Sequence, residues 1–267
     1  MNTQRDVRER DFHDGWASEI DPRTVPVRQT FAASTSPEPR WLLSQLGDLR
    51  GKRVLDLGTG AGEAAVYFAL QGANVTAVDL SPGMLDVVRC VAKHHGVEVT
   101  CEVASAEDLS IFEAASFDVV YAANVLHHVD TDRCLGEVAR VLRAGGAAVS
   151  WDPIAYNPII NVYRRMATEV RTSDEHPLRR ADLELFKKHF RHYSSRFFWF
   201  STLLVFLKFY LIDRVHPNED RYWKRILTQE NELRTSYLFL ESIDRGLLKV
   251  FPSLRWLCWT VAVVAQK

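Results

Sequence analysis

A glycine-rich turn at residues 58–62 constrains the fold of this chain more than any other feature. It follows the apolar run 54–57, which is typical of a buried strand, and it precedes the apolar stretch 63–70, which has helical spacing. Gly58, Gly60 and Gly62 allow the backbone to turn sharply and bring amide N–H groups at the helix start close to a ligand. A strand, a glycine turn and a helix in this order predict the first βαβ unit of a parallel sheet.

The alternation of strands and helices continues to about residue 152. We predict strands at 75–80, 97–103, 117–122 and 147–151, and helices at 82–95 and 130–143. Ser81 and Pro82 form a helix-start signal, because the hydroxyl caps a free N–H and a proline at the first position loses no hydrogen bond. Gly145 and Gly146 are expected to end the helix 130–143. This pattern predicts an α/β protein with a Rossmann-like, doubly wound sheet.

Beyond residue 153 the pattern changes. We predict helices at 158–171 and 181–190, a strand rich in aromatic residues at 192–200 and a last strand at 256–265. Between the last two strands, apolar residues recur at helical spacing, and we interpret 203–250 as a helical insertion. The strongly apolar stretch 197–212 has two open interpretations, which are contact with a lipophilic ligand or membrane, and packing in the core or in a homodimer.

Charge and cysteine content exclude several classes of protein. Lys and Arg total 33 against 34 Asp and Glu, so the chain lacks the basic excess of a nucleic-acid binder. The four cysteines lie far apart, without metal-ligand spacing, so we expect no metal site and a reducing compartment. Residues 1–10 alternate in charge and do not resemble a secretory signal, which favours the cytoplasm. The stretch 197–212 contains Lys208 and is shorter than the ~20 residues of a spanning helix.

The ligand at the glycine turn is predicted to be an adenosine-type molecule. A dinucleotide fingerprint requires a third glycine where this chain has Glu63, and that carboxylate disfavours a pyrophosphate. Asp79 ends the next predicted strand, 21 residues after Gly58, where a carboxylate accepts hydrogen bonds from ribose hydroxyls. The alternative is that the glycines form only a turn and that Asp79 only caps a helix.

Five segments together resemble the class I S-adenosylmethionine-dependent methyltransferases. Residues 56–62 (DLGTGAG) resemble the first motif of that family, and 78–85 (VDLSPGML) its acidic second motif. Residues 105–109 (SAEDL) stand where the family has an adenine-contacting loop. Residues 117–129 and 138–146 resemble the fourth strand with its following loop and the next helix and turn. The resemblance covers residues 50 to 152 and implies S-adenosyl-L-methionine as cofactor and an antiparallel last strand.

The resemblance also implies roles for individual residues. Gly58, Thr59 and Gly60 would pass beside the methionine part of the cofactor, and Asp56 would orient their turn. Asp79 would accept hydrogen bonds from the ribose hydroxyls. The remaining cofactor contacts would involve the adenine and the methionine end, and their residues are Leu80, Met84, Ala106, Glu107 and Asn124. The family often has a lid over the cofactor, and we assign residues 1–50, with His13 and Trp16, to such a lid. We assign 51–202 and 251–267 to the core, and 203–250 to acceptor or membrane contact.

The expected function is methyl transfer to a lipophilic small molecule, such as a natural product, a quinone-like compound or a fatty acceptor. A hydroxyl acceptor needs a base, and His127 or His128 after the fourth strand is suited to that role, unless both only support the loop. Asp174, Glu175 and His176 form a second polar cluster. O-methylation is the preferred prediction. C-methylation of a terpenoid or aromatic carbon and a noncatalytic cofactor-binding module remain alternatives.

Overall fold

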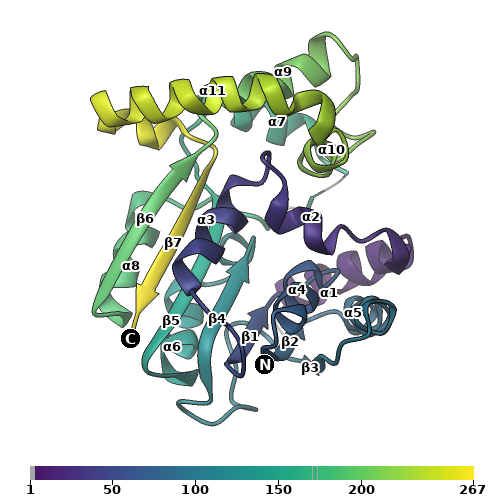
Figure 1. The fold of residues 1–267 in the computed structure, drawn as a ribbon, viewed down its shortest axis with the longest axis vertical. Coiled ribbons are helices and arrows are strands. Elements are labelled where there is room, and N and C mark those ends of the chain that lie inside the picture. Colours follow the sequence, from purple (N-terminus) through teal and green to yellow (C-terminus); the bar gives the residue numbers. More distant parts are fainter. Residues whose placement is uncertain (1–3, 170, 173) are drawn as a thin grey trace.

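The computed structural model describes residues 4–169, 171, 172 and 174–267. Within these residues, one sheet has the strand order β3-β2-β1-β4-β5-β7-β6 (Figure 1). Strands β1 to β5 are parallel, and β7 lies antiparallel between β5 and β6. The strands are Arg53–Leu57 (β1), Asn74–Asp79 (β2), Thr100–Val103 (β3), Phe117–Ala123 (β4), Leu142–Pro153 (β5), His192–Phe198 (β6) and Thr260–Gln266 (β7). The predicted fold class is confirmed.

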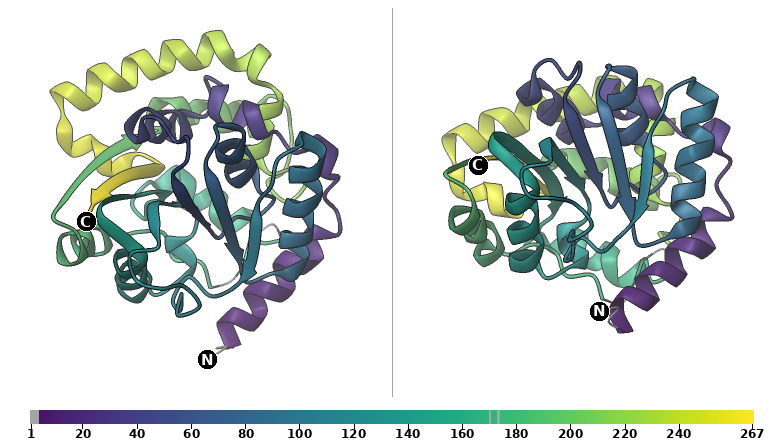
Figure 2. Two further views of the ribbon diagram at one scale, coloured as in Figure 1. Left: turned by 60° about the horizontal axis from the view of Figure 1, so that its bottom comes forward. Right: turned by 90° about the horizontal axis from the view of Figure 1, so that it is seen from below.

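Helices cover both faces of this sheet (Figure 2). Side chains alternate along β4, so that Val119 and Tyr121 pack toward one face while Val120 and Ala122 pack toward the other. The first face is covered by α3 (Pro37–Leu46), α4 (Glu63–Leu70), α5 (Pro82–His95) and the C-terminal helices. The second face is covered by α6 (Thr131–Val141) and α8 (Arg180–His189).

The N-terminal segment and the insertion between β6 and β7 are helical, as predicted. The N-terminal segment contains α1 (Gln4–Ala17), α2 (Val27–Ala32) and α3. Helix α7 (Pro158–Met166) follows β5. The insertion contains α9 (Leu204–Leu211), α10 (Tyr222–Thr228), α11 (Glu230–Val250) and two short 3₁₀ turns, η3 (Ser201–Leu203) and η4 (Pro252–Leu257).

The local signals around β2 fold as the sequence predicts. The Ser81 hydroxyl accepts a hydrogen bond from Met84 N at 3.0 Å and caps α5. Gly96 ends this helix in the left-handed conformation, with φ of +69°. The predicted helices 63–70 and 82–95 have the same bounds as α4 and α5 in the structure, so both predictions are confirmed to the residue.

Four predicted boundaries are wrong. Gly145 and Gly146 lie inside β5 and do not end α6. A Cβ at Gly146 would lie 3.0 Å from Asp118 O, so the glycine permits a close approach of β5 to β4. Residues 97–99 precede β3, and α7 ends at Met166 instead of 171. The last strand begins at Thr260, since residues 252–257 form η4.

The apolar stretch 197–212 is mainly part of the core. Phe198, Trp199, Leu203, Phe206 and Phe209 are each at most 7% exposed, and they belong to the cluster that covers the first face of the sheet. The exposed apolar side chains of this stretch are Leu204, Tyr210, Leu211 and Ile212. No helix among the described residues is long and apolar enough to cross a membrane.

Candidate active site

The glycine turn has the backbone geometry of a close ligand approach. Gly58 has a φ of +64°, and a Cβ at this position would lie 2.5 Å from Val125 Cγ2. The Thr59 hydroxyl donates a hydrogen bond to Asp56 Oδ2 at 2.6 Å, which ties the turn to the end of β1. Burial raises the pKa of the Asp56 carboxyl to about 7. Nothing lies within 4 Å of the position of a Cβ on Gly60, so this side of the turn is open.

Asp79 lies beside this turn at the end of β2. Its Oδ2 accepts a hydrogen bond from Gly60 N at 3.0 Å, and its Oδ1 accepts one from Ser81 N at 2.9 Å. The side chain is almost fully buried. Burial raises the pKa of the Asp79 carboxyl, and the nearby His13 opposes this effect. The structure therefore brings the turn and the predicted ribose acid together.

The other residues predicted to contact the cofactor differ in exposure. Met84 is completely buried and packs with Val66, Val87 and Val91. Ala106 and Glu107 are both 8% exposed, and Leu80 is partly buried. Asn124 is exposed after β4, has a φ of +56° and donates its backbone N–H to Trp151 O at 2.8 Å. The Glu107 carboxylate accepts a hydrogen bond from Asp130 N and forms an ion pair with Arg5.

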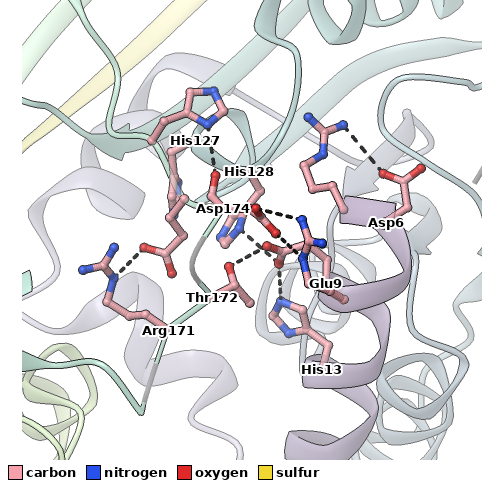
Figure 3. Close-up of polar contacts among 12 residues, drawn as sticks. Asp6, Glu9, His13, His127, His128, Arg171, Thr172 and Asp174 are labelled. Carbon is pink, nitrogen blue, oxygen red and sulfur yellow. Dashed lines mark hydrogen bonds and ion pairs between the residues drawn. The ribbon is translucent and has the colours of Figure 1, made fainter. Parts of the chain in front are cut away.

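Helix α1 lies over these residues. Its Asp14 accepts hydrogen bonds from Gly83 N at 3.0 Å and from the Ser81 hydroxyl, next to Asp79. Glu9 Oε2 lies 3.2 Å from His128 Nδ1, and the His13 ring lies 6.3 Å from the His128 ring (Figure 3). A ligand that reaches Asp79 and His128 must therefore pass α1.

His127 and His128 follow β4 in the 3₁₀ turn η2 (Leu126–His128). His127 Nδ1 lies 2.9 Å from Oδ1 of Asp152, a buried residue near the end of β5. Burial lowers the pKa of the His127 imidazole and raises that of the Asp152 carboxyl. Burial thus favours the neutral form of the imidazole, and one proton is shared between His127 Nδ1 and Asp152 Oδ1. The sequence analysis did not identify Asp152, although an acid near the carboxyl end of the strand next to the histidine loop was a usable signal.

The predicted polar cluster at 174–176 contacts the two histidines. His176 N donates a hydrogen bond to His127 O at 2.8 Å. Ligand atoms of His127, His128 and Glu175 all lie within 4.8 Å of one another, which is a spacing that a metal ion can use. However, Glu175 Oε2 already binds Arg164 at 3.2 Å and Arg171 at 2.6 Å. The expected lack of a metal site stays a prediction.

Comparison with known proteins finds methyltransferases. Residues 55–150 match the sequence family described as the methyltransferase domain. This match is consistent with the resemblance of residues 50 to 152 to the class I S-adenosylmethionine-dependent methyltransferases. The chain is 32% identical over 155 residues to a protein named ubiquinone biosynthesis O-methyltransferase from Xanthomonas euvesicatoria, with 55% of this chain and 64% of the relative covered. A protein of the same name from Xylella fastidiosa is 36% identical over 141 residues, with 51% and 53% covered. The matches thus span less than two thirds of these relatives.

Solved methyltransferase structures share the fold. A geranyl diphosphate methyltransferase has a TM-score of 0.58 at 16% identity, over 87% of this chain and 84% of that one. Phosphoethanolamine N-methyltransferase 2 from Haemonchus contortus has a TM-score of 0.57 at 23% identity, over 85% and 51%. At these identities the likeness concerns the sheet and its helices alone.

The cofactor of this methyltransferase domain is S-adenosylmethionine, and the donor set of the site fits it. The open side of Gly60 leaves backbone room for a ligand. Asp79 supplies a buried carboxylate for hydroxyl donors. Glu63, at the first position of α4, places a carboxylate where a phosphate would otherwise be bound, and a nucleoside without phosphates avoids that repulsion.

Proposed function

We propose that this chain is an O-methyltransferase whose acceptor is a lipophilic small molecule with a hydroxyl group. The observation that carries the proposal is the contact between His127 Nδ1 and Asp152 Oδ1 at 2.9 Å, near the carboxyl ends of β4 and β5. Ligands of open α/β sheets bind at this edge. The relatives named ubiquinone biosynthesis O-methyltransferase support a quinone-like acceptor. A natural product or a fatty compound with a hydroxyl is the wider class.

The proposed chemistry needs alignment and one proton acceptor. When bound, S-adenosylmethionine supplies an electrophilic methyl group on a sulfonium. Asp79, Asn124 and the glycine turn would hold the cofactor beside the histidine turn. His127 Nε2 has no hydrogen-bond partner among the described residues, so it is free to accept the proton of the acceptor hydroxyl. The proposal requires Asp152 to be ionised, so that it accepts the Nδ1–H, leaves the lone pair on Nε2 and stabilises the imidazolium that forms.

His127 is the better candidate base of the two histidines. His128 Nδ1 faces Glu9 on α1 and is buried without a hydrogen bond among the described residues. Its neighbours are therefore lid residues, whereas His127 is held by a strand of the sheet. We assign His128 to contact with α1, which belongs to the lid within residues 1–50. We assign the region 154–259, with its insertion at 203–250, to contact with the acceptor.

The test is methyl transfer from labelled S-adenosylmethionine to components of a lipophilic extract, followed by mass spectrometry. We expect a labelled ether. His127→Ala and Asp152→Asn should each lower kcat by about 100-fold or more while leaving the Kd of S-adenosylhomocysteine unchanged. His128→Ala is the matched variant, and it should retain most of kcat.

Each other outcome has a defined meaning. A label on carbon would indicate C-methylation, and cofactor binding without transfer to any fraction would indicate a noncatalytic module. If His127→Ala turns over at the wild-type rate, His127 is not the base. Circular dichroism of each variant separates loss of folding from loss of chemistry.

A further inference from the structure

A groove lies between β6 and α11, and its lining contains none of the residues of the site described above. Its volume is about 350 Å³, and it is lined by the second half of β6, one side of α11 and η4. We call it the α11 groove. Its lining residues that matter here are four cations and two acids, namely Arg196, Arg245, Lys249, Arg255, Glu241 and Asp244.

The α11 groove has an excess of positive charge that the protein does not neutralise. Asp244 is buried and fully used, because it accepts hydrogen bonds from the backbone and hydroxyl groups of Ser201 and Thr202. Glu241 lies 3.9 Å from Arg245. The other three cations of the groove have no ion pair among the described residues.

Aromatic rings hold two of these cations in place. The Arg196 guanidinium lies 5.2 Å from the centre of the Phe198 ring, and that of Arg255 lies 5.7 Å from Phe197 and 5.3 Å from Trp256. Contact with a ring face leaves the N–H donors at the edge of the guanidinium unused. These donors suit the oxygens of a phosphate group.

Exposed apolar side chains occur in α11, in η4 and between these two elements, which also line the groove. Val250 is 67% exposed and Phe251 is 55% exposed, directly after Lys249, and Leu257 in η4 is 38% exposed. Further along α11, Phe239 is 66% exposed. Helix α11 crosses the molecule as an outer layer (Figure 1), so this side is open to a large partner.

A row of cations runs along α11 beside these apolar groups. Arg234, Arg245 and Lys249 are spaced by 11 and 4 residues, and Leu238 stands between the first two, so the four share one side of the helix. Basic and apolar groups side by side on an outer helix match a surface that is anionic outside and apolar beneath.

We propose that the α11 groove, together with Leu238, Phe239, Val250 and Phe251, docks on a membrane surface and binds the phosphate headgroup of an acidic phospholipid. The apolar side chains enter the boundary between headgroups and acyl chains, and the cations bind the phosphate oxygens. This placement differs from the contact through 197–212 that the sequence suggested, because most of that stretch is buried.

The docking surface lies close to the candidate active site. Asp152 pairs with Val261, and Val261 pairs with Phe197, which lines the groove. Two strand spacings correspond to roughly 10 Å. Docking would thus bring the membrane that holds a lipophilic acceptor to the side of the sheet next to β5, whose Asp152 contacts His127. This last step rests on the proposed function, whereas docking itself does not.

The test is sedimentation of the full chain with vesicles, without cofactor or acceptor. We expect binding to phosphatidylcholine vesicles that contain about one third phosphatidylglycerol, and little binding to phosphatidylcholine alone. The triple variant Arg245→Ala, Lys249→Ala, Arg255→Ala should weaken binding by about 100-fold. The matched control removes the same charge from other surfaces, with Arg23→Ala, Arg50→Ala and Arg89→Ala, and it should bind as the wild type does.

Three results would overturn the proposal. The first is no binding to the acidic vesicles, and the second is an equal loss in both triple variants, which indicates general charge attraction. The third is full competition by inorganic phosphate without any effect of Phe251→Ser, which indicates a site for a soluble phosphate. Methyl transfer to a water-soluble acceptor, measured without vesicles, should be equal in the wild type and the groove variant, so this test is separate from that of the proposed function.

Discussion

The two halves of this molecule differ in what determines their structure, which is local sequence signals in one and contacts between distant residues in the other. From β1 to β5, residues 53–153, several elements begin or end at a local signal such as Ser81 or Gly96, and the match to the methyltransferase domain lies entirely here. From residue 154 to 259, the helices are held by aromatic side chains that meet from distant positions, such as Phe206 and Trp259 at 4.9 Å between ring centres. The first half thus contains the matched methyltransferase domain, and we propose that the second half selects the acceptor.

The largest expected effect concerns how firmly the aromatic side chains hold the second half together. Phe206 on α9 is 3% exposed and contacts the rings of Tyr163, Tyr222 and Trp259. Phe206→Ala should lower the free energy of unfolding by about 3–5 kcal/mol, since it leaves a cavity in the main core. Leu211→Ala, at a side chain 65% exposed, should change it by less than about 0.5 kcal/mol. Equal effects in denaturant unfolding would mean that the ring contacts of Phe206 do not stabilise the second half.

The next effect concerns a buried carboxyl that joins α3 to the last strand. Glu38 accepts a hydrogen bond from the Thr260 hydroxyl, and burial raises its pKa from 4.5 to about 7. The folded state thus favours the protonated form, whose stabilising contribution is complete below pH 4.5 and is lost as the pH rises to about 7. Glu38→Gln should therefore be more stable than the wild type at pH 8 by about 3 kcal/mol, with a smaller difference at pH 5.

Denaturant unfolding at the two pH values measures this difference. Glu113→Gln, at an exposed position, is the control and should follow the wild type at both. A Glu38→Gln curve parallel to that of the wild type would show that Glu38 is ionised in the folded protein.

The third prediction tests the function of the first half. Asp79→Ala removes the buried carboxylate beside the glycine turn, and the Kd of S-adenosylhomocysteine should rise about 100-fold, since hydrogen bonds to a charged group are lost. Titration calorimetry measures the Kd. Asp86→Ala, at an exposed position of α5, should leave it unchanged. An unchanged Kd in Asp79→Ala would reject the ribose assignment.

The smallest expected effect concerns the contact between α1 and the insertion. The Trp16 ring lies 3.9 Å from the Arg221 guanidinium and 4.5 Å from the Lys224 ammonium, both at the start of α10. Trp16→Ala should weaken the closed position of α1 by about 1 kcal/mol, so that its amide hydrogens exchange about fivefold faster. Val7→Ala on an exposed side of α1 should not change the exchange. Equal rates in all three proteins would mean that α10 does not hold the lid.

Sequence reasoning succeeded where structure is set locally. The glycine turn, the cap at Ser81 and the end at Gly96 each act within a few residues, so their elements were predictable. Asp79 was predictable as a neighbour of the turn, because the ends of adjacent parallel strands meet at one edge.

Sequence reasoning failed where the role of a residue depends on contact with a residue far away in the sequence. Gly146 resembles a helix stop, but its role is set by the carbonyl of Asp118 on β4. Asp152 stands in β5 without any motif, and only the fold brings it to His127. The apolar stretch 197–212 gave no sign of whether it was covered, because its cover comes from residues such as Tyr222, Tyr237 and Trp259.

Because β7 is synthesised last, β6 cannot pair in the sheet until the chain is almost complete. β6 pairs with β7 in the sheet, yet β7 is made about sixty residues after β6. At ribosomal rates of about 5–20 residues per second, β6 waits several seconds for its partner. During that time it presents unpaired backbone groups, which are the kind of edge on which other nascent chains aggregate. The completed half that binds the cofactor can therefore fold early, while the half assigned to the acceptor depends on the last strand and on any chaperone that covers β6 until then.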